Sequence, residues 1–152
     1  MERLTIPNAA ELIINRLEEH GFEAYVVGGC VRDSIMGITP HDWDICTSAL
    51  PEQIIKVFSD MKVIPTGLKH GTVTVVIDGV EFEITTYRID GEYTDNRHPE
   101  AVEFVKDLKL DLMRRDFTIN ALAYNHKSGI IDYFNGVEDI HNKVIRCVGN
   151  PN

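Results

Sequence analysis

The sequence has few cysteines, no long apolar run and no excess of positive charge. Only three of its 152 residues are cysteines, and no two of them are spaced as Cys-x-x-Cys. That scarcity argues against a disulfide framework or a zinc knuckle and favours a reducing, cytoplasmic setting. No run approaches the roughly 18 apolar residues of a membrane-spanning helix. The N-terminus also lacks the pattern of a secretory signal.

Acidic residues outnumber basic residues in the sequence. Fifteen Lys and Arg against 24 Asp and Glu give a net charge of −9 at pH 7. Domains that grip nucleic acid through its phosphates usually carry a basic surface, so tight binding of nucleic acid by this chain alone is not expected. The apolar share of 43% and charged share of 26% are typical of a soluble globular protein. At this length we expect one domain with its own core.

Apolar periodicity and turn residues predict a mixed sheet with helices packed on it. The dipeptide Asp78-Gly79 between two β-rich runs is the strongest hairpin signal in the chain. Asn8 is expected to cap the first helix and Gly21 to end it. The expected helices are 8–21, 30–36, 51–58, a mostly helical stretch up to 123, and 137–142. The expected strands are 24–27, 42–46, 72–77, 80–87, 122–125, 130–133 and 144–148, with a loop at 89–100.

Asp42 and Asp44 flank one residue of an expected strand, so their side chains point to the same face. Two carboxylates that close repel each other unless a cation neutralises them, and hard oxygen ligands suit magnesium. A solvated acidic strand face is the alternative interpretation. Glu81 and Glu83 share one face of the hairpin strand, and either could add a third carboxylate. Two aspartates and a third acid on neighbouring strands are what two-metal phosphoryl transfer requires.

Gly28 and Gly29 stand between an expected strand and an expected helix. Paired glycines there let the backbone approach a phosphate, and a helix N-terminus adds N–H donors. Arg32 lies in the first turn of the expected helix, where a positive charge is opposed by the helix dipole. Its placement there makes sense if an anion binds at the same turn. A plain turn with a surface arginine is the alternative, because the motif is neither a dinucleotide fingerprint nor a Walker loop.

Arg114 and Arg115 are adjacent and offer bidentate donors for phosphate oxygens. Asp116 could accept from a ribose hydroxyl, or it could cap the following helix. The six histidines are scattered and form no His-x-x-x-His pair. We interpret Cys46, which shares a face with the paired aspartates, as a packing residue.

Five segments, taken in order, resemble the bacterial, class II CCA-adding tRNA nucleotidyltransferases. That group belongs to the polymerase-β-like nucleotidyltransferase superfamily, which also includes bacterial poly(A) polymerases. The segments are GGCVRD at 28–33, DWDICTSA at 42–49, GLKHGT at 67–72, RRDFTINA at 114–121 and DYFNG at 132–136. Each motif alone is weak, whereas the ordered set is specific.

The resemblance implies an α/β (α+β) catalytic head over residues 1–148, with a mixed, mainly antiparallel sheet and flanking helices, and a linker that begins at 149–152. It implies Mg²⁺ bound by Asp42 and Asp44, with Glu83 as the third catalytic acid and Glu81 as runner-up. It also assigns nucleotide binding to several residues and a C-to-A switching role to a loop at 91–99. The nucleotide-binding residues are Gly28, Gly29, Arg32, Arg115 and Asp116.

The implied partners are ATP, CTP and the 3′ end of a tRNA, with no membrane. The implied activity is template-independent transfer of CMP and AMP to that end. The alternatives are a poly(A) polymerase, a CC-only or A-only member of the group, or an inactive nucleotide-binding module. The resemblance places the residues that read the base, and the domains that grip tRNA, beyond Asn152.

Overall fold

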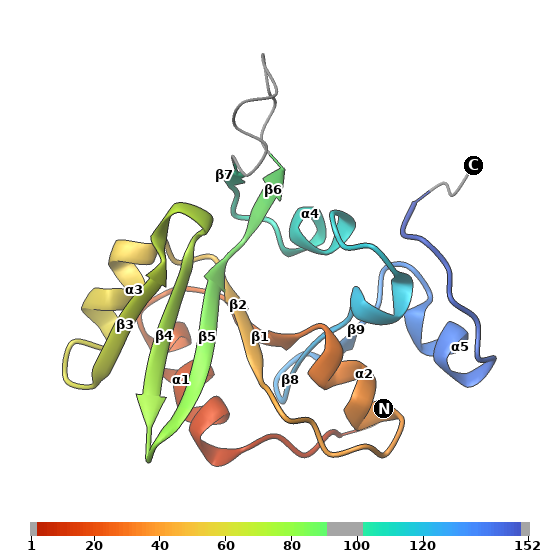
Figure 1. The fold of residues 1–152 in the computed structure, drawn as a ribbon, viewed down its shortest axis with the longest axis horizontal. Helices are drawn as coiled ribbons and strands as arrows, with labels where there is room; N and C mark the ends of the chain where they lie inside the picture. The colour runs from red at the N-terminus through yellow and green to blue at the C-terminus, as the bar shows by residue number, and fades with distance from the viewer. Residues whose placement is uncertain (1–2, 91–101, 150–152) are drawn as a thin grey trace.

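A seven-stranded sheet runs through the middle of the molecule (Figure 1). The computed structural model describes residues 3–90 and 102–149. Strand β2 runs parallel to β5, and every other neighbouring pair in this sheet is antiparallel. The predicted mixed, mainly antiparallel sheet with flanking helices is therefore confirmed. In sheet order the strands are β3 (Lys62–Gly67), β4 (Thr72–Ile77), β5 (Val80–Thr86), β2 (Asp44–Thr47), β1 (Ala24–Val27), β8 (Ala123–Asn125) and β9 (Gly129–Ile131).

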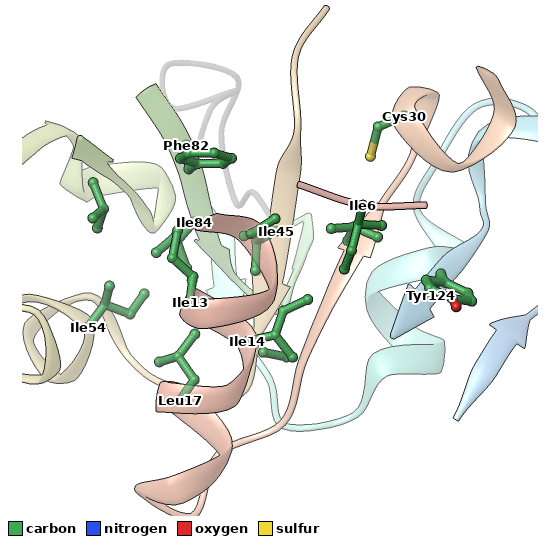
Figure 2. Close-up of a cluster of buried hydrophobic side chains, with 14 of the residues drawn as sticks. Ile6, Ile13, Ile14, Leu17, Cys30, Ile45, Ile54, Phe82, Ile84 and Tyr124 are labelled. Carbon is green, nitrogen blue, oxygen red and sulfur yellow. The ribbon is translucent and has the colours of Figure 1, made fainter. Parts of the chain in front are cut away.

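One face of the sheet is covered by α1 (Asn8–Glu19) and α3 (Pro51–Val57), which pack against each other and against the strands. The helix α1 buries Ile13, Ile14 and Leu17 against strand residues such as Ile45 and Ile84, all at most 3% exposed (Figure 2). Each such side chain contributes about 1.5–3 kcal/mol by leaving water. This cluster is the main core of the domain.

The opposite face is covered only in part. Helix α4 (Leu108–Met113) buries Leu108 and Leu112 against Val27, Cys46 and Tyr87. Because side chains alternate along a strand, Asp44, two positions before Cys46 on β2, lies on this same face. That end of the face thus carries Asp44, which pairs with Glu83 of β5.

Six further elements complete the described chain. Helices α2 (Gly29–Ile35) and α5 (Gly136–His141) pack together beside β8 and β9, with the short 3₁₀ turn η2 (Thr118–Asn120) between them. Strands β6 (Arg88–Asp90) and β7 (Val102–Phe104) form a separate two-stranded ribbon that extends beyond β5 (Figure 1). A 3₁₀ turn, η1 (Leu68–His70), precedes β4. In the described ranges, no helix has the length and apolar character needed to cross a membrane.

Several local predictions need correction. Pro7, not Asn8, occupies the N-cap of α1 and no side chain caps it. Strand β2 starts at Asp44, so Asp42 lies before the strand rather than in it. Residues 144–148 form no strand, because their pairing is limited to one isolated bridge between Phe117 and Cys147.

The edge strand β3 was not predicted. Pro65 interrupts its β pattern, and the register of β3 against β4 shifts between Ile64 and Gly67 around that proline. A proline is tolerated there because β3 is an edge strand and needs hydrogen bonds on one side only. The expected loop at 89–100 begins instead as strand β6, while residues 91–101, and with them the implied switching loop, lie outside the described residues.

Candidate active site

The sequence-predicted acids line one cavity on the open part of the sheet. The parallel pairing of β2 and β5 places Asp44 opposite Glu83. Asp42 lies in the segment that leads into β2. Together with Glu81 and Trp43 these acids line a cavity of about 270 Å³. Two strands that are far apart in the sequence thus form one acidic hollow.

The surroundings of Asp44 disfavour its ionised form. Burial raises the pKa of Asp44 above the ordinary value of an aspartate, and the charges of Glu83 and Asp42 raise it further. The guanidinium of Arg115 acts in the opposite direction. A cation would favour the charged forms of these crowded carboxylates. Their oxygen donors fit a hard divalent cation.

The acids form an open hollow and not a closed metal cage. Within residues 3–90 and 102–149, no three His, Cys, Asp or Glu side chains gather closely enough to hold a metal ion by themselves. The expectation that Asp42, Asp44 and Glu83 converge holds only to the extent that they share a cavity. Magnesium commonly keeps several waters and binds one or two carboxylates together with substrate phosphates, so an open arrangement suits it.

Two arginines lie over the paired glycines. A Cβ added to Gly28 would stand 3.3 Å from Nη1 of Arg115, and one added to Gly29 would stand 3.3 Å from Nη2 of Arg32. Gly28 also has φ 84° and ψ −136°, a conformation that glycine adopts far more readily than other residues. The glycines therefore let both guanidinium groups lie against the turn that joins β1 to α2.

Arg32 is held on both sides by polar side chains. Its Nη1 donates to Oδ1 of Asn120 at 2.7 Å, and its Nε donates to Oδ1 of Asp33 at 3.0 Å. Its Nη2 also lies 3.0 Å from that oxygen of Asp33. The Arg32 side chain is 31% exposed, so it differs from the loosely held surface arginine of the alternative interpretation.

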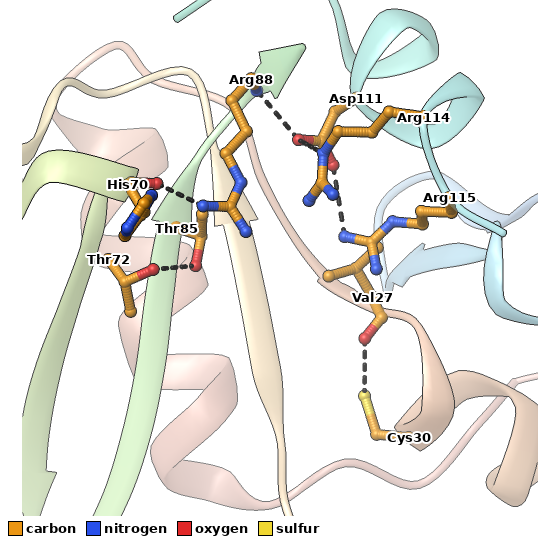
Figure 3. Close-up of polar contacts among 9 residues, drawn as sticks. All are labelled: Val27, Cys30, His70, Thr72, Thr85, Arg88, Asp111, Arg114 and Arg115. Atoms are coloured by element: carbon orange, nitrogen blue, oxygen red, sulfur yellow. Dashed lines mark hydrogen bonds and ion pairs between the residues drawn. The ribbon is translucent and has the colours of Figure 1, made fainter. Parts of the chain in front are cut away.

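The sequence reasoning missed Asp111, a carboxylate that is 1% exposed. Its Oδ2 accepts from Nη2 of Arg115 at 3.3 Å, and its Oδ1 lies 3.6 Å from Nε of Arg114 (Figure 3). The backbone N–H of Arg88 also donates to Oδ1 at 2.9 Å. An acid three and four residues before paired arginines on a helical stretch is the signal that could have identified it. Asp111 and Gly28 together fix where the Arg115 guanidinium lies.

Asp116 directly follows Arg115 in the chain. Its side chain is exposed, and its backbone carbonyl accepts from the N–H of Val148 at 3.1 Å. The N-cap of η2 is Phe117, and no side chain caps that turn. The capping interpretation of Asp116 is therefore wrong, while ribose binding stays a prediction.

The two cysteines nearest the site are packing residues. Cys46 is buried under α4, and burial raises the pKa of its thiol well above the ordinary value. The Cys30 thiol donates to the carbonyl of Val27 at 3.4 Å, and burial raises its pKa to about 11 (Figure 3). Both thiols stay protonated near neutral pH and are poor nucleophiles.

A larger hollow of about 490 Å³ lies between residues 3–7 and the segment around 37–40, and it shares Trp43 with the acidic cavity. Its lining contains no acidic side chain and one positively charged side chain, Arg3. The smaller acidic cavity is therefore the candidate active site. The charge of Arg115 acts on Asp44, which links the cavity to the arginines at the paired glycines.

Comparison with known proteins identifies the family of the chain. Residues 24–146 match the family described as "Poly A polymerase head domain". The chain belongs to this head-domain family. The matched range includes every element from β1 to α5, and with them the acids of the cavity and Arg32, Arg114 and Arg115. Membership of this nucleotidyltransferase family implies dependence on a divalent metal ion.

Curated relatives of the head domain carry the name CCA-adding enzyme. The relative from Ligilactobacillus salivarius is 52% identical over 139 residues, which cover 91% of this chain and 34% of the relative. The relative from Enterococcus faecalis is 48% identical over 154 residues, covering 99% of this chain and 37% of the relative. The head domain thus spans about a third of the length of these relatives.

Solved structures share the same fold. A Bacillus stearothermophilus CCA-adding enzyme in complex with CTP superposes with a TM-score of 0.83 at 46% identity, covering 95% of the head domain and 34% of that chain. A tRNA nucleotidyltransferase complexed with a primer tRNA and an incoming ATP analogue gives 0.70 at 33% identity, covering 90% of the head domain and 39% of that chain.

Proposed function

We propose that this head domain catalyses template-independent transfer of CMP and AMP from CTP and ATP to the 3′ end of tRNA. In this CCA addition or repair, the 3′-hydroxyl oxygen attacks the α-phosphorus, the bond to the β-phosphate oxygen breaks, and pyrophosphate leaves. The observation that carries the proposal is the acidic cavity of Asp42, Asp44 and Glu83 coupled to Arg115. The likeness to CCA-adding enzymes in sequence and fold supports it.

In this proposal Asp42 and Asp44 hold Mg²⁺, and Glu83 is the third catalytic acid, with Glu81 as the alternative. Bound there, Mg²⁺ would make the 3′-hydroxyl a better nucleophile and neutralise charge on the leaving pyrophosphate. The contribution of the chain itself is to place Arg115 where its positive charge favours the ionised form of Asp44, and to orient the reactants. The raised pKa of Asp44 supports the assignment, because a carboxylate held in that environment favours a cationic partner.

The triphosphate would lie against Gly28, Gly29, Arg32 and Arg115, with Asp116 accepting from the ribose. Nε of Arg115 is buried and has no hydrogen-bond partner in the described part of the chain. That atom is enclosed, so a phosphate would reach Arg115 from the exposed part of its side chain, of which 21% is accessible. Helix α2 has only seven residues, so the arginines rather than its N-terminus supply the attraction for phosphate.

The proposal assigns residues 1–148 to the catalytic head and 149–152 to the start of a linker. Since the head domain carries net negative charge, we expect the grip on tRNA to come mainly from residues outside this sequence. A protein that repairs tRNA would work in the cytoplasm, where its three free cysteines would stay reduced.

The experiment that tests the function uses the full-length protein and four RNA primers. Three are tRNAs that end at the discriminator base, after one C, and after two Cs; the fourth is an unrelated oligoadenylate. With CTP, ATP and Mg²⁺, each tRNA should be completed to CCA and then stop, and the oligoadenylate should not be extended.

Other products identify the alternatives. Long A tails on the oligoadenylate would make the protein a poly(A) polymerase. Arrest after CC, or addition of A alone, would make it a partial enzyme of the same group. Magnesium-dependent triphosphate binding without any extension would reduce it to a nucleotide-binding module and overturn the proposal.

A further inference from the structure

We propose that Asn120 is a positioning residue that sets the direction of the Arg32 guanidinium toward the triphosphate; the inference rests on the proposed function, in which Arg32 binds that group. The observation is the 2.7 Å hydrogen bond from Nη1 of Arg32 to Oδ1 of Asn120. It joins residues 88 positions apart in the sequence, from α2 and from η2.

The donors of Arg32 are divided between partners. A guanidinium has five N–H groups. Asp33 takes the N–H of Nε and faces Nη2, and Asn120 takes one N–H of Nη1. By this count at least one N–H on Nη1 and one on Nη2 remain for an anion. Arg32 is thus presented to its ligand as a two-pronged donor in a fixed plane.

Asn120 is suited to this role because its own backbone is held. Its N–H donates to the carbonyl of Phe117 at 3.0 Å, which closes the η2 turn. The turn is tied to α5 by Thr118, which is 2% exposed and whose Oγ1 donates to Oδ2 of Asp139 at 2.6 Å. Gly136 of α5 packs so closely that a Cβ there would overlap the carbonyl of Thr118.

Asp33 alone cannot supply this constraint. It is the next residue in the same helix, so it moves with Arg32 and cannot fix the arginine relative to the rest of the site. The η2 side also reaches the paired glycines, since the carbonyl of Asn120 lies 3.9 Å from where a Gly28 Cβ would stand. Asn120 therefore ties Arg32 to the η2 turn, whose backbone also lies close to Gly28.

A double-mutant cycle with Arg32→Ala and Asn120→Ala tests the inference. The readout is the Kd of ATP with Mg²⁺, measured by calorimetry on the full-length protein. Arg32→Ala should raise the Kd about 10- to 100-fold, the range for a lost charged hydrogen bond. Asn120→Ala should raise it several-fold in the parent and leave it unchanged in the Arg32→Ala protein. Asn15→Ala, at an exposed position of α1, is the matched control and should change nothing.

A second readout follows Arg32 directly. In the parent without ligand, nitrogen NMR should show separate Nη signals for Arg32, because its rotation is restricted by its partners. Asn120→Ala should broaden or merge them, whereas a purely structural role in η2 would leave them separate. Asn120→Ser keeps a polar group but cannot reach Nη1, and it carries the same expectation if the alanine variant does not fold.

The remaining outcomes overturn the inference. An equal loss from Asn120→Ala with and without Arg32 would mean that Asn120 touches the ligand or acts elsewhere. Unchanged affinity in either single variant would remove the role of that residue, and the inference with it. Because the cycle measures binding, it stays readable even if the parent adds no nucleotide to RNA, which would refute the proposed function instead.

Discussion

Gly28 adopts a positive φ and lies directly against the guanidinium of Arg115. We predict that Gly28→Ala lowers both the free energy of unfolding and the affinity for ATP. A residue other than glycine at φ 84° and ψ −136° costs about 1–3 kcal/mol. The added Cβ would also stand 3.3 Å from Nη1 of Arg115, so that guanidinium has to shift. Urea unfolding and ATP titration with Mg²⁺ measure the two effects.

Gly21→Ala is the control for this substitution. Gly21 also has a positive φ, of 89°, but a Cβ there would meet nothing within 4 Å. The Gly21→Ala protein should therefore have a lower free energy of unfolding than the parent and the same affinity for ATP. If both variants bind ATP as tightly as the parent, the contact between Gly28 and Arg115 has no part in the site.

At the scale of elements, local signals in the sequence predicted most helices and strands. The hairpin followed from Asp78 and Gly79, which both adopt positive φ in the turn, as a two-residue hairpin of the favoured kind requires. The expected strand at 144–148 is wrong because the segment opposite it enters the η2 turn at Thr118, after a single bridge between Phe117 and Cys147. The edge strand β3 was missed because Pro65 breaks its local pattern.

The candidate site was predictable as a set of residues but not as an arrangement. The Asp-x-Asp motif and the paired glycines are visible in the sequence. The register that sets Asp44 beside Glu83 depends on parallel pairing of β2 and β5, which no local pattern encodes. The contact between Asn120 and Arg32 depends on tertiary packing and became visible only in the fold. Asp111 was overlooked, although its spacing before Arg114 and Arg115 is a local signal.

The connection between α5 and η2 gives a prediction about pH. The hydrogen bond from Thr118, aided by Arg146, lowers the pKa of Asp139 despite the opposing effect of burial. Because the pKa of Asp139 is lowered, its ionised carboxylate stabilises the fold fully when the pH is above the ordinary pKa of 3.8. This stabilisation is lost as the pH falls through the lowered pKa of the folded protein. Thr118→Val should therefore lower the Tm near neutral pH.

The difference in Tm between Thr118→Val and the parent should shrink as the pH falls below 3.8. Thermal unfolding followed by circular dichroism from about pH 7 down to about pH 2.5 checks this. Thr39→Val, at an exposed position, should track the parent at every pH. A Tm difference that stays constant across this range would show that the carboxylate of Asp139 is not the partner that matters.

For the molecule as a whole, the proposed nucleotide contacts are all to phosphates and ribose. We therefore predict that the 152-residue chain binds ATP, CTP, GTP and UTP with similar affinities in the presence of Mg²⁺. A good bidentate contact to a base edge is worth about 1–3 kcal/mol of discrimination, judged from protein–DNA complexes. Calorimetry with the four triphosphates measures it. A tenfold or larger preference for CTP and ATP would mean that the head domain itself reads the base.

The central claim is that Asp42 and Asp44 form the metal-dependent transfer centre, and nucleotide addition measures it most directly. Full-length protein with Asp42→Asn or Asp44→Asn should fold, since each change relieves repulsion between carboxylates, and should fail to add CMP to a tRNA that lacks CCA. Asp78→Asn, in the exposed hairpin turn, removes the same charge away from the cavity and should leave addition at the parental rate. Substantial Mg²⁺-dependent addition by either cavity variant would contradict the account.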